Sequence, residues 1–231
     1  AFHRCHQLDF VDDMLEARFG PWGVVGINWR PPWTAPALAP QDFLYTRTLR
    51  EGSHSDSRII GCLRGVVEGD TQAAVDALAA PTVQLVTLTI TEKGYGLTPS
   101  SGALDFDNPD VAADLTGAEA PRTALGLLAQ ALETRRARGA GPITLLSCDN
   151  IPVNGRRLRA GLLALVEATR PALLDWIETH VAFPCAMVDR IVPASQPHER
   201  DELEQRLGLR DEGAVFGEPF RQWVIEDRFA G

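Results

Sequence analysis

The sequence predicts an α/β fold in which a mostly parallel, doubly wound sheet carries helices on both faces. Three observations lead to this prediction. Strand-like and helical segments alternate along the 231 residues. The strand-like runs are uniformly apolar, as in strands that are buried on both faces. Polar clusters directly follow three of these runs, and ligands bind at the carboxyl ends of the strands in such sheets.

The first half of the chain is expected to contain two helices, a strand and a β-hairpin. Apolar residues spaced three or four apart predict the first helix, namely Leu8, Val11, Leu15 and Phe19. A short buried strand is predicted over 22–28, followed by a Pro-rich loop. Residues 42–50 and 57–67 have strand character and a polar connection, which is typical of a hairpin inserted between the parallel strands. A short helix follows over 70–81.

The second half continues the alternation of strands and helices. Strands are predicted over 83–91, 143–147 and 187–192, and residues 214–227 have strand character. Helices are predicted over 121–139, 156–168, 171–181 and 198–209. We expect the strands over 22–28, 83–91, 143–147 and 187–192 to be neighbours in one sheet, with their carboxyl ends at a shared edge.

Composition argues against several classes of protein. The net charge of −9 leaves no basic face for nucleic acid. No apolar run is long enough for a membrane span, and no signal peptide is visible. The four cysteines are far apart and form no CxxC motif, which favours a reducing, cytoplasmic setting. His3 and His6 are the only close pair of histidines and have no third ligand nearby, so no metal site is expected.

The three polar clusters are TEKGY (91–95), SCDN (147–150) and VDR (188–190). If the preceding strands are parallel, the clusters share one edge of the sheet and form a site. Each cluster also has a structural interpretation, since polar residues after strands cap helices, and Asp149 is a candidate for such a cap. Asp189 and Arg190 stand inside an apolar run. They are either a structural ion pair at a strand end or a polar group at the mouth of a binding site.

Several segments resemble the mannitol dehydrogenase family, the polyol-specific long-chain dehydrogenases. Residues 181–193, VAFPCAMVDRIVP, meet every defined position of the family signature, down to VDRIVP. Residues 38–46, 89–95, 145–155 and 218–231 also resemble the family, in its order. The first residues, AFHRCHQ, resemble the segment that completes its N-terminal glycine-rich turn. The resemblance covers essentially the whole chain.

The resemblance implies that residues 1–231 are an NAD(P)-binding, Rossmann-like domain of a longer two-domain protein. The first strand of its sheet and a helical C-terminal domain are absent from the sequence given. The implied activity is metal-free transfer of a hydride between a sugar alcohol or aldonate and the matching keto sugar, of the mannitol/fructose or mannonate/fructuronate type. The family's acid/base is a lysine in a Lys-x4-Asn-x2-His motif, which the only lysine, Lys93, does not match.

Two alternatives to this function stay open. The chain could be a nucleotide-binding module without catalysis, as the absence of the lysine motif suggests. It could also belong to an enzyme of the mannitol-1-phosphate 5-dehydrogenase type, whose phosphate pocket would lie in the other domain. In each case the partners expected are small molecules, and neither nucleic acid nor membrane.

The resemblance also assigns roles on the substrate side. Asn150 is the expected catalytic residue, because its amide can donate to the carbonyl oxygen on which negative charge develops. Its alternative role is a hydrogen bond at the start of a helix. Asp189 is the expected substrate-binding residue, because a carboxylate accepts hydrogen bonds from two sugar hydroxyls. Arg190 is expected to orient Asp189 or to cap a neighbouring loop.

On the cofactor side, Phe2 and Arg4 stand where the glycine-rich turn enters the first helix, beside the pyrophosphate. Asn28 ends the second family strand, where Rossmann domains hold the adenosine ribose. Thr91 and Glu92 are expected to end the fourth family strand on the nicotinamide side. The cofactor expected is NAD, and NADP stays open because Asn28 replaces an acidic residue and Arg30 follows.

Overall fold

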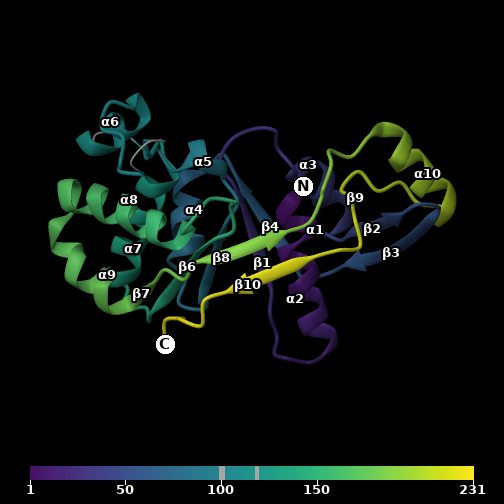
Figure 1. The fold of residues 1–231 in the computed structure, drawn as a ribbon, viewed down its shortest axis with the longest axis horizontal. Helices are drawn as coiled ribbons and strands as arrows, with labels where there is room; N and C mark the ends of the chain where they lie inside the picture. The colour runs from purple at the N-terminus through teal and green to yellow at the C-terminus, as the bar shows by residue number, and fades with distance from the viewer. Residues whose placement is uncertain (99–101, 118–119) are drawn as a thin grey trace. The chain divides into compact units, whose positions relative to one another are not determined.

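The computed structural model describes residues 1–98, 102–117 and 120–231 (Figure 1). The chain divides into two compact units. The first unit consists of Ala1–Asp70 and Asp189–Gln222, and the second of Thr71–Val188 and Trp223–Gly231. Each unit contains parallel strand pairs and buried apolar side chains of its own. The α/β class predicted from the sequence is confirmed.

The first unit combines parallel and antiparallel strand pairs. β1 (Val24–Asn28) pairs in parallel with β4 (Leu63–Glu68). β2 (Tyr45–Glu51) pairs with β3 (His54–Ile60) as an antiparallel hairpin and with β9 (Val215–Gly217) in parallel. The helical segments of this unit are α1 (Phe2–Cys5), α2 (Gln7–Glu16), α3 (Ala35–Leu38), the 3₁₀ turn η1 (Ala39–Gln41) and α10 (Pro197–Leu207).

The predicted hairpin is confirmed, but the single strand predicted over 57–67 is wrong. That run is divided at Gly61 and Cys62 into β3 and β4, which belong to different sheets. The Gly61 N–H donates to Oδ1 of Asp12 at 3.0 Å instead of to a neighbouring strand. The pairing with β2 ends before Gly61, and β4 pairs with β1.

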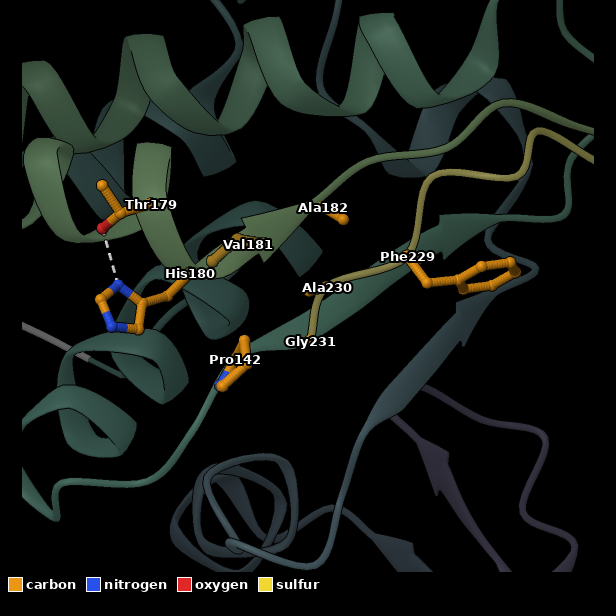
Figure 2. Close-up of a pocket in the computed structure, with 8 residues that line it drawn as sticks. All are labelled: Pro142, Thr179, His180, Val181, Ala182, Phe229, Ala230 and Gly231. Atoms are coloured by element: carbon orange, nitrogen blue, oxygen red, sulfur yellow. Dashed lines mark hydrogen bonds between the residues drawn. The ribbon is translucent and has the colours of Figure 1, made fainter.

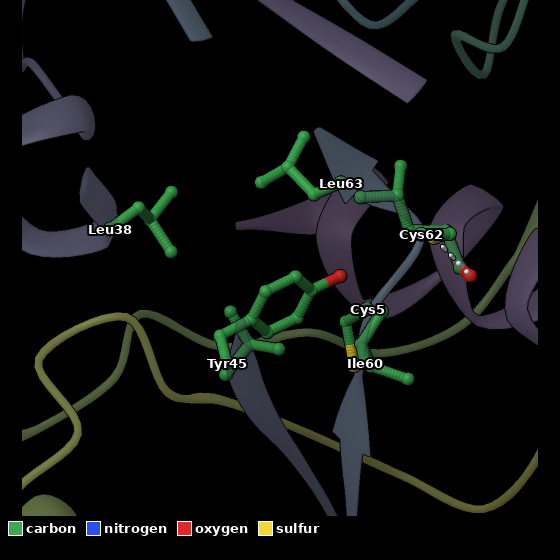
Figure 3. Close-up of a cluster of buried hydrophobic side chains, with 8 residues drawn as sticks. Cys5, Leu38, Tyr45, Ile60, Cys62 and Leu63 are labelled. Atoms are coloured by element: carbon green, nitrogen blue, oxygen red, sulfur yellow. Dashed lines mark hydrogen bonds between the residues drawn. The ribbon is translucent and has the colours of Figure 1, made fainter. Parts of the chain in front are cut away.

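A hydrophobic core holds the first unit together (Figure 3). Its members come from the N-terminal helices, α3, the hairpin, the connection between β3 and β4, and the strands β4 and β9: Cys5, Leu8, Leu38, Tyr45, Ile60, Cys62, Leu63 and Val215. All of them are at most 3% exposed. Because α1 and α2 contribute Cys5 and Leu8, burial of apolar area fixes the N-terminal helices against the hairpin.

The second unit is built on a three-stranded parallel sheet. β6 (Ile143–Ser147) is buried at every position and lies between β5 (Leu85–Leu88) and β7 (Val181–Ala182). The helical segments are α4 (Thr71–Leu78), α5 (Thr91–Gly94), α6 (Pro109–Thr116), α7 (Ala124–Ala137), α8 (Asn154–Thr169), the 3₁₀ turn η2 (Pro171–Leu173) and α9 (Leu174–His180). Thr123 caps α7 by accepting from the Gly126 N–H at 2.9 Å.

The prediction of one sheet through all four strands is wrong. β8 (Ala186–Asp189) pairs with β10 (Gln222–Ile225), and β1 and β5 lie in separate sheets. In the doubly wound strand order 3-2-1-4-5-6, the first strand joins the two halves of the sheet. No strand precedes β1 within the residues that the structure describes, so no ladder links β1 to β5. Strand β5 is also shorter than the predicted 83–91.

Candidate functional site

Asp149 connects the carboxyl ends of the neighbouring strands β5 and β6. Its carboxylate accepts the N–H groups of Ile90 and Thr91 at 3.1 and 3.0 Å and the Tyr95 hydroxyl at 2.7 Å. The Tyr95 oxygen also lies 2.6 Å from Oγ of Ser147, the last residue of β6. The cap predicted for Asp149 on the helix after its own strand is not observed, because the N-cap of α8 is Val153. Asp149 instead accepts N–H groups at the start of the short helix α5. Two of the three predicted clusters, TEKGY and SCDN, share one edge of the sheet.

This edge has an unusual backbone and a protonated tyrosine. Thr91 and Val153 have φ angles of 63° and 50°, a left-handed conformation that β-branched residues rarely adopt. Such strain persists only where surrounding contacts hold it, and it concentrates at functional sites. Burial, followed by the Asp149 charge, raises the pKa of Tyr95 above its ordinary value. Tyr95 thus keeps its proton and donates to Asp149.

The side chain of Asn154 fixes the loop between β6 and α8. Its Nδ2 donates to the carbonyls of Ser147, Asp149 and Ala186 at 3.1, 3.1 and 2.8 Å. Its Oδ1 accepts the N–H groups of Gly155 and Ala186 at 2.8 and 2.9 Å. Asn154 is 1% exposed. Sequence reasoning missed this residue, although the Asn-Gly pair after a strand was a signal for a special turn.

Asn150 lies in the loop that Asp149 and Asn154 hold, and its side chain is exposed. Helix α8 begins at Asn154 and its N-cap is Val153, so the alternative role of Asn150 at the helix start is not observed. Among the residues that the structure describes, none forms a hydrogen bond with its side chain. The loop is therefore fixed on both sides of Asn150, while the Asn150 amide itself is accessible to a ligand.

Thr91 and Glu92 do not end a strand as predicted. They form the first turn of α5, because β5 ends at Leu88 and the Thr91 backbone turns into the left-handed region. The exposed Glu92 carboxylate lies 3.9 Å from the Arg157 guanidinium. Lys93 follows in the same helix and is exposed. Both Thr91 and Glu92 stand at the carboxyl edge of the β5–β6 pair.

Asp189 and Arg190 have separate environments. Arg190 is buried, and its guanidinium donates to Asp9 at 2.8 Å and to the carbonyls of Cys5, Pro219 and Phe220. Asp189 is the last residue of β8 and is exposed. Arg190 therefore does not orient Asp189 through an ion pair. Because β8 pairs with β10, the third cluster is not on the sheet edge that carries the other two.

The Phe2 and Arg4 side chains pack within the first unit. Phe2 stacks on His6 with ring centroids 5.1 Å apart. The Arg4 guanidinium donates to the Gly213 carbonyl and lies 5.3 Å from the centroid of the Tyr45 ring. The Tyr45 hydroxyl in turn donates to the Arg4 carbonyl at 2.6 Å. The Arg4 side chain is thus engaged in holding α1.

Asn28 ends β1 beside Glu68, the last residue of β4, and the two Cα positions are partners in the parallel ladder. The Asn28 Nδ2 donates to Oε1 of Glu68 at 2.9 Å and to the Pro32 carbonyl at 3.0 Å. Sequence reasoning missed Glu68. Because the register of a parallel pair is not visible in one strand alone, only a correct pairing of β1 with β4 could have indicated it.

A surface hollow lies elsewhere in the second unit (Figure 2). It is lined by Pro142, by the corner between α9 and β7, and by Phe229, Ala230 and Gly231. Pro142 precedes β6, so the hollow stands at the amino end of that strand, whereas ligands of parallel sheets bind at the carboxyl ends. The predicted site residues are not among those that line it.

The seven predicted site residues are divided between the units. Phe2, Arg4, Asn28 and Asp189 belong to the first, and Thr91, Glu92 and Asn150 to the second. Within 1–98, 102–117 and 120–231, no group of three or more His, Cys, Asp or Glu side chains is placed to hold a metal ion. Over the same residues, no helix is long and apolar enough to cross a membrane.

Parallel strands with polar side chains at their carboxyl ends define an α/β domain of the Rossmann class. The chain belongs to the mannitol dehydrogenase family, since the family model for the mannitol dehydrogenase Rossmann domain matches residues 1–231. The family resemblance seen in the sequence is therefore confirmed.

Two curated relatives and one solved structure illustrate the similarity. A mannitol 2-dehydrogenase of Cereibacter sphaeroides is 42% identical and a D-mannonate oxidoreductase of Escherichia coli is 39% identical, each over 99% of this chain. A structure of Pseudomonas fluorescens mannitol 2-dehydrogenase in ternary complex with NAD and D-mannitol is 37% identical, with a TM-score of 0.91 over 100% of this chain. The chain spans 48% of the length of each of these proteins.

Proposed function

We propose that residues 1–231 are the cofactor-binding part of an NAD(P)-dependent oxidoreductase that interconverts a sugar alcohol or aldonate with the matching keto sugar. The observation that carries the proposal is the exposed Asn150 amide on a loop fixed by Asp149 and Asn154 at the carboxyl edge of β6. The relatives named above, which act on mannitol or mannonate by their names, support this substrate class.

The residues of each unit fit a dinucleotide. Asn28 and Glu68 place acceptor oxygens at the carboxyl ends of β1 and β4, which suits the hydroxyls of a ribose. The backbone at Phe2 is the proposed neighbour of the pyrophosphate, since the Arg4 guanidinium is directed to Gly213. Thr91 and Glu92 are proposed to line the nicotinamide side. When bound, the cofactor would accept or supply the hydride.

Asn150 and Asp189 are proposed to act on the substrate. The Asn150 amide donates to the carbonyl oxygen and stabilises the charge that develops there, which is worth about 2.7–4 kcal/mol for one well-placed donor. The Asp189 carboxylate accepts hydrogen bonds from sugar hydroxyls and thereby orients the substrate. The proton on the substrate oxygen needs an acid/base, and the family resemblance expects it from a lysine motif that residues 1–231 do not contain.

The test is a screen of the complete gene product. Fructose, fructuronate, tagaturonate and fructose 6-phosphate are each offered with NADH and with NADPH, and cofactor oxidation is followed by absorbance. We expect turnover of an unphosphorylated keto sugar or ketouronate. Turnover confined to the phosphorylated ketose would favour the mannitol-1-phosphate 5-dehydrogenase type. Cofactor binding without any turnover would favour the non-catalytic module.

A further inference from the structure

The end of strand β4 presents a carboxylate that is held in one position. Oε1 of Glu68 accepts the Asn28 amide at 2.9 Å and also three groups from the following loop. These are the Thr34 N–H, the Thr34 hydroxyl and the Ala35 N–H, at 2.5, 3.1 and 3.0 Å. Four donors on one oxygen leave the Glu68 side chain little freedom. No donor to its Oε2 is found within the described residues, and the side chain is half-buried.

Glu68 is ionised at neutral pH. Burial acts to raise its pKa, but the hydrogen bonds from Asn28, Thr34 and Ala35 outweigh burial and lower the pKa below its ordinary value of 4.5. The carboxylate therefore carries a full negative charge at the carboxyl ends of β1 and β4.

The neighbouring Asn28 has no hydrogen left to donate. Its two amide hydrogens are used by Glu68 Oε1 and by the Pro32 carbonyl at 3.0 Å. The atoms that Asn28 and Glu68 can still offer to a ligand are oxygens, Oδ1 and Oε2. Such oxygens accept the hydrogen of a ribose hydroxyl, whereas a phosphate group has only acceptors and negative charge to present.

We propose that Glu68 selects the cofactor by accepting the 2′-hydroxyl of the adenosine ribose and repelling the 2′-phosphate of NADP. In Rossmann domains this selection is made by an acidic residue at the end of the second strand. Asn28 holds that position here without a charge, and the charge comes from the adjacent strand β4 instead. The proposal rests on the proposed function, because it concerns the cofactor of the same site.

Arg30 would favour NADP, the opposite of the preference expected from Glu68. It follows Asn28 by two residues and is exposed, and an arginine at this place accommodates the 2′-phosphate in NADP-dependent enzymes. The two residues thus predict opposite preferences. We expect Glu68 to decide the preference in favour of NAD, because its carboxylate is held by a hydrogen bond from Asn28, the residue at the ribose position.

The test compares ligands that differ only at the ribose. Dissociation constants of 5′-AMP and of adenosine 2′,5′-bisphosphate are measured by calorimetry on the complete gene product, together with kcat/KM for NAD and NADP. We expect 5′-AMP and NAD to be preferred. Glu68→Gln keeps the side-chain shape and an acceptor oxygen but removes the negative charge. The ratio of the two dissociation constants should therefore fall by about tenfold or more, because adenosine 2′,5′-bisphosphate binds more tightly.

Asp114→Asn is the matched control. Asp114 also holds a loop, by accepting the N–H groups of Arg122 and Thr123 and the Thr123 hydroxyl. Its replacement should lower the melting temperature and leave the ligand preference unchanged. If Glu68 only supports its loop, Glu68→Gln would behave like this control, and an equal loss of affinity for both ligands would overturn the proposal.

A measurement on the unmodified protein covers the case in which Glu68→Gln does not fold. Repulsion of the 2′-phosphate is screened by salt, so the preference for 5′-AMP should fall between about 20 and 500 mM NaCl. A preference that is independent of salt, or directed to the bisphosphate, contradicts the proposal. Failure of the proposed function looks different, because it appears in the screen of keto sugars: a non-catalytic module would bind 5′-AMP and NAD but turn over no substrate. Failure of the present proposal changes only the preference between the two ribose ligands.

Discussion

Arg190 donates through Nη1 to Oδ2 of Asp9 at 2.8 Å, and both side chains are at most 2% exposed. The two residues are 181 positions apart in the sequence. Asp9 also pairs with Arg47 at 3.0 Å and with Arg221 at 2.8 Å. Arg190 is therefore part of a buried charge cluster that holds helix α2 to the segment after β8, while its neighbour Asp189 stays exposed.

Replacing Arg190 should destabilise the protein strongly. Arg190→Met keeps most of the side-chain length but leaves Asp9 short of one partner and the Cys5 carbonyl without its guanidinium. Breaking a buried ion pair in this way costs about 3–5 kcal/mol in the free energy of unfolding. Chemical denaturation of the wild-type and variant proteins measures it. A change below about 1 kcal/mol would mean that the Arg190–Asp9 pair contributes little net stability.

Asp189→Ala should affect sugar binding and not stability. The side chain is exposed at the end of β8, so its removal takes away no buried contact. We expect a higher KM for the sugar substrate, an unchanged KM for the cofactor and a melting temperature within about 1 °C of the wild type, since exposed substitutions usually change stability by less than about 0.5 kcal/mol. A lower melting temperature with an unchanged sugar KM would show that Asp189 is structural.

Asn150→Ala should mainly lower kcat. An amide that donates to the developing oxyanion matters most in the transition state, and its loss typically lowers kcat by about 10²–10³-fold. Because the Asn150 side chain is exposed, the melting temperature should not change. Asn154→Ala is the contrasting variant, because it removes buried hydrogen bonds and should lower both stability and kcat. Equal melting temperatures for the wild type, Asn150→Ala and Asn154→Ala would contradict the positioning role of Asn154.

His6 should make the protein sensitive to acid. Burial first, and then the charges of Arg190 and Arg221, lower the pKa of His6 below its ordinary value of 6.5, although its hydrogen bond to the Gln222 carbonyl acts in the opposite direction. The folded protein therefore keeps the imidazole neutral where the unfolded chain binds a proton. Stability should fall as the pH drops below about 6.5, by up to about 1.4 kcal/mol per pH unit from this group.

The measurement is chemical denaturation at pH 7.5 and pH 5.5 for the wild type and for His6→Gln, whose amide can still donate to Gln222. The variant should lose less stability between the two pH values than the wild type loses. Identical losses would assign the acid sensitivity to other groups.

Local patterns predicted the parts of the fold that depend on local physics. The uniformly apolar run at 143–147 became the fully buried β6, and the amphipathic run after Thr123 became α7. The run at 57–67 could not be divided correctly, because β3 and β4 choose partners, β2 and β1, that lie elsewhere in the chain. In the same way, β8 gave no local sign that it pairs with β10.

The candidate site was predictable where it follows strand ends. Asp149 and Asn150 follow β6 directly, so their place at the sheet edge came from the parallel-strand rule. Glu68 and Asn154 were not predictable in this way. The role of Glu68 depends on the register between β1 and β4, and the role of Asn154 depends on its hydrogen bond to the distant Ala186. The different roles of Arg190 and Asp189 became visible only through the contact between Arg190 and Asp9, which the sequence does not reveal.

Direct transfer of a hydride from the cofactor to the carbonyl carbon of the substrate can be followed with an isotope. The complete gene product is given NADH carrying deuterium at the transferable position, with each keto sugar and ketouronate of the screen, and the products are analysed by mass spectrometry and NMR. We predict a polyol or aldonate with one deuterium on the carbon that bears the new hydroxyl group. Product without deuterium at that carbon, or no product from any of these substrates, would rule out direct hydride transfer to these substrates.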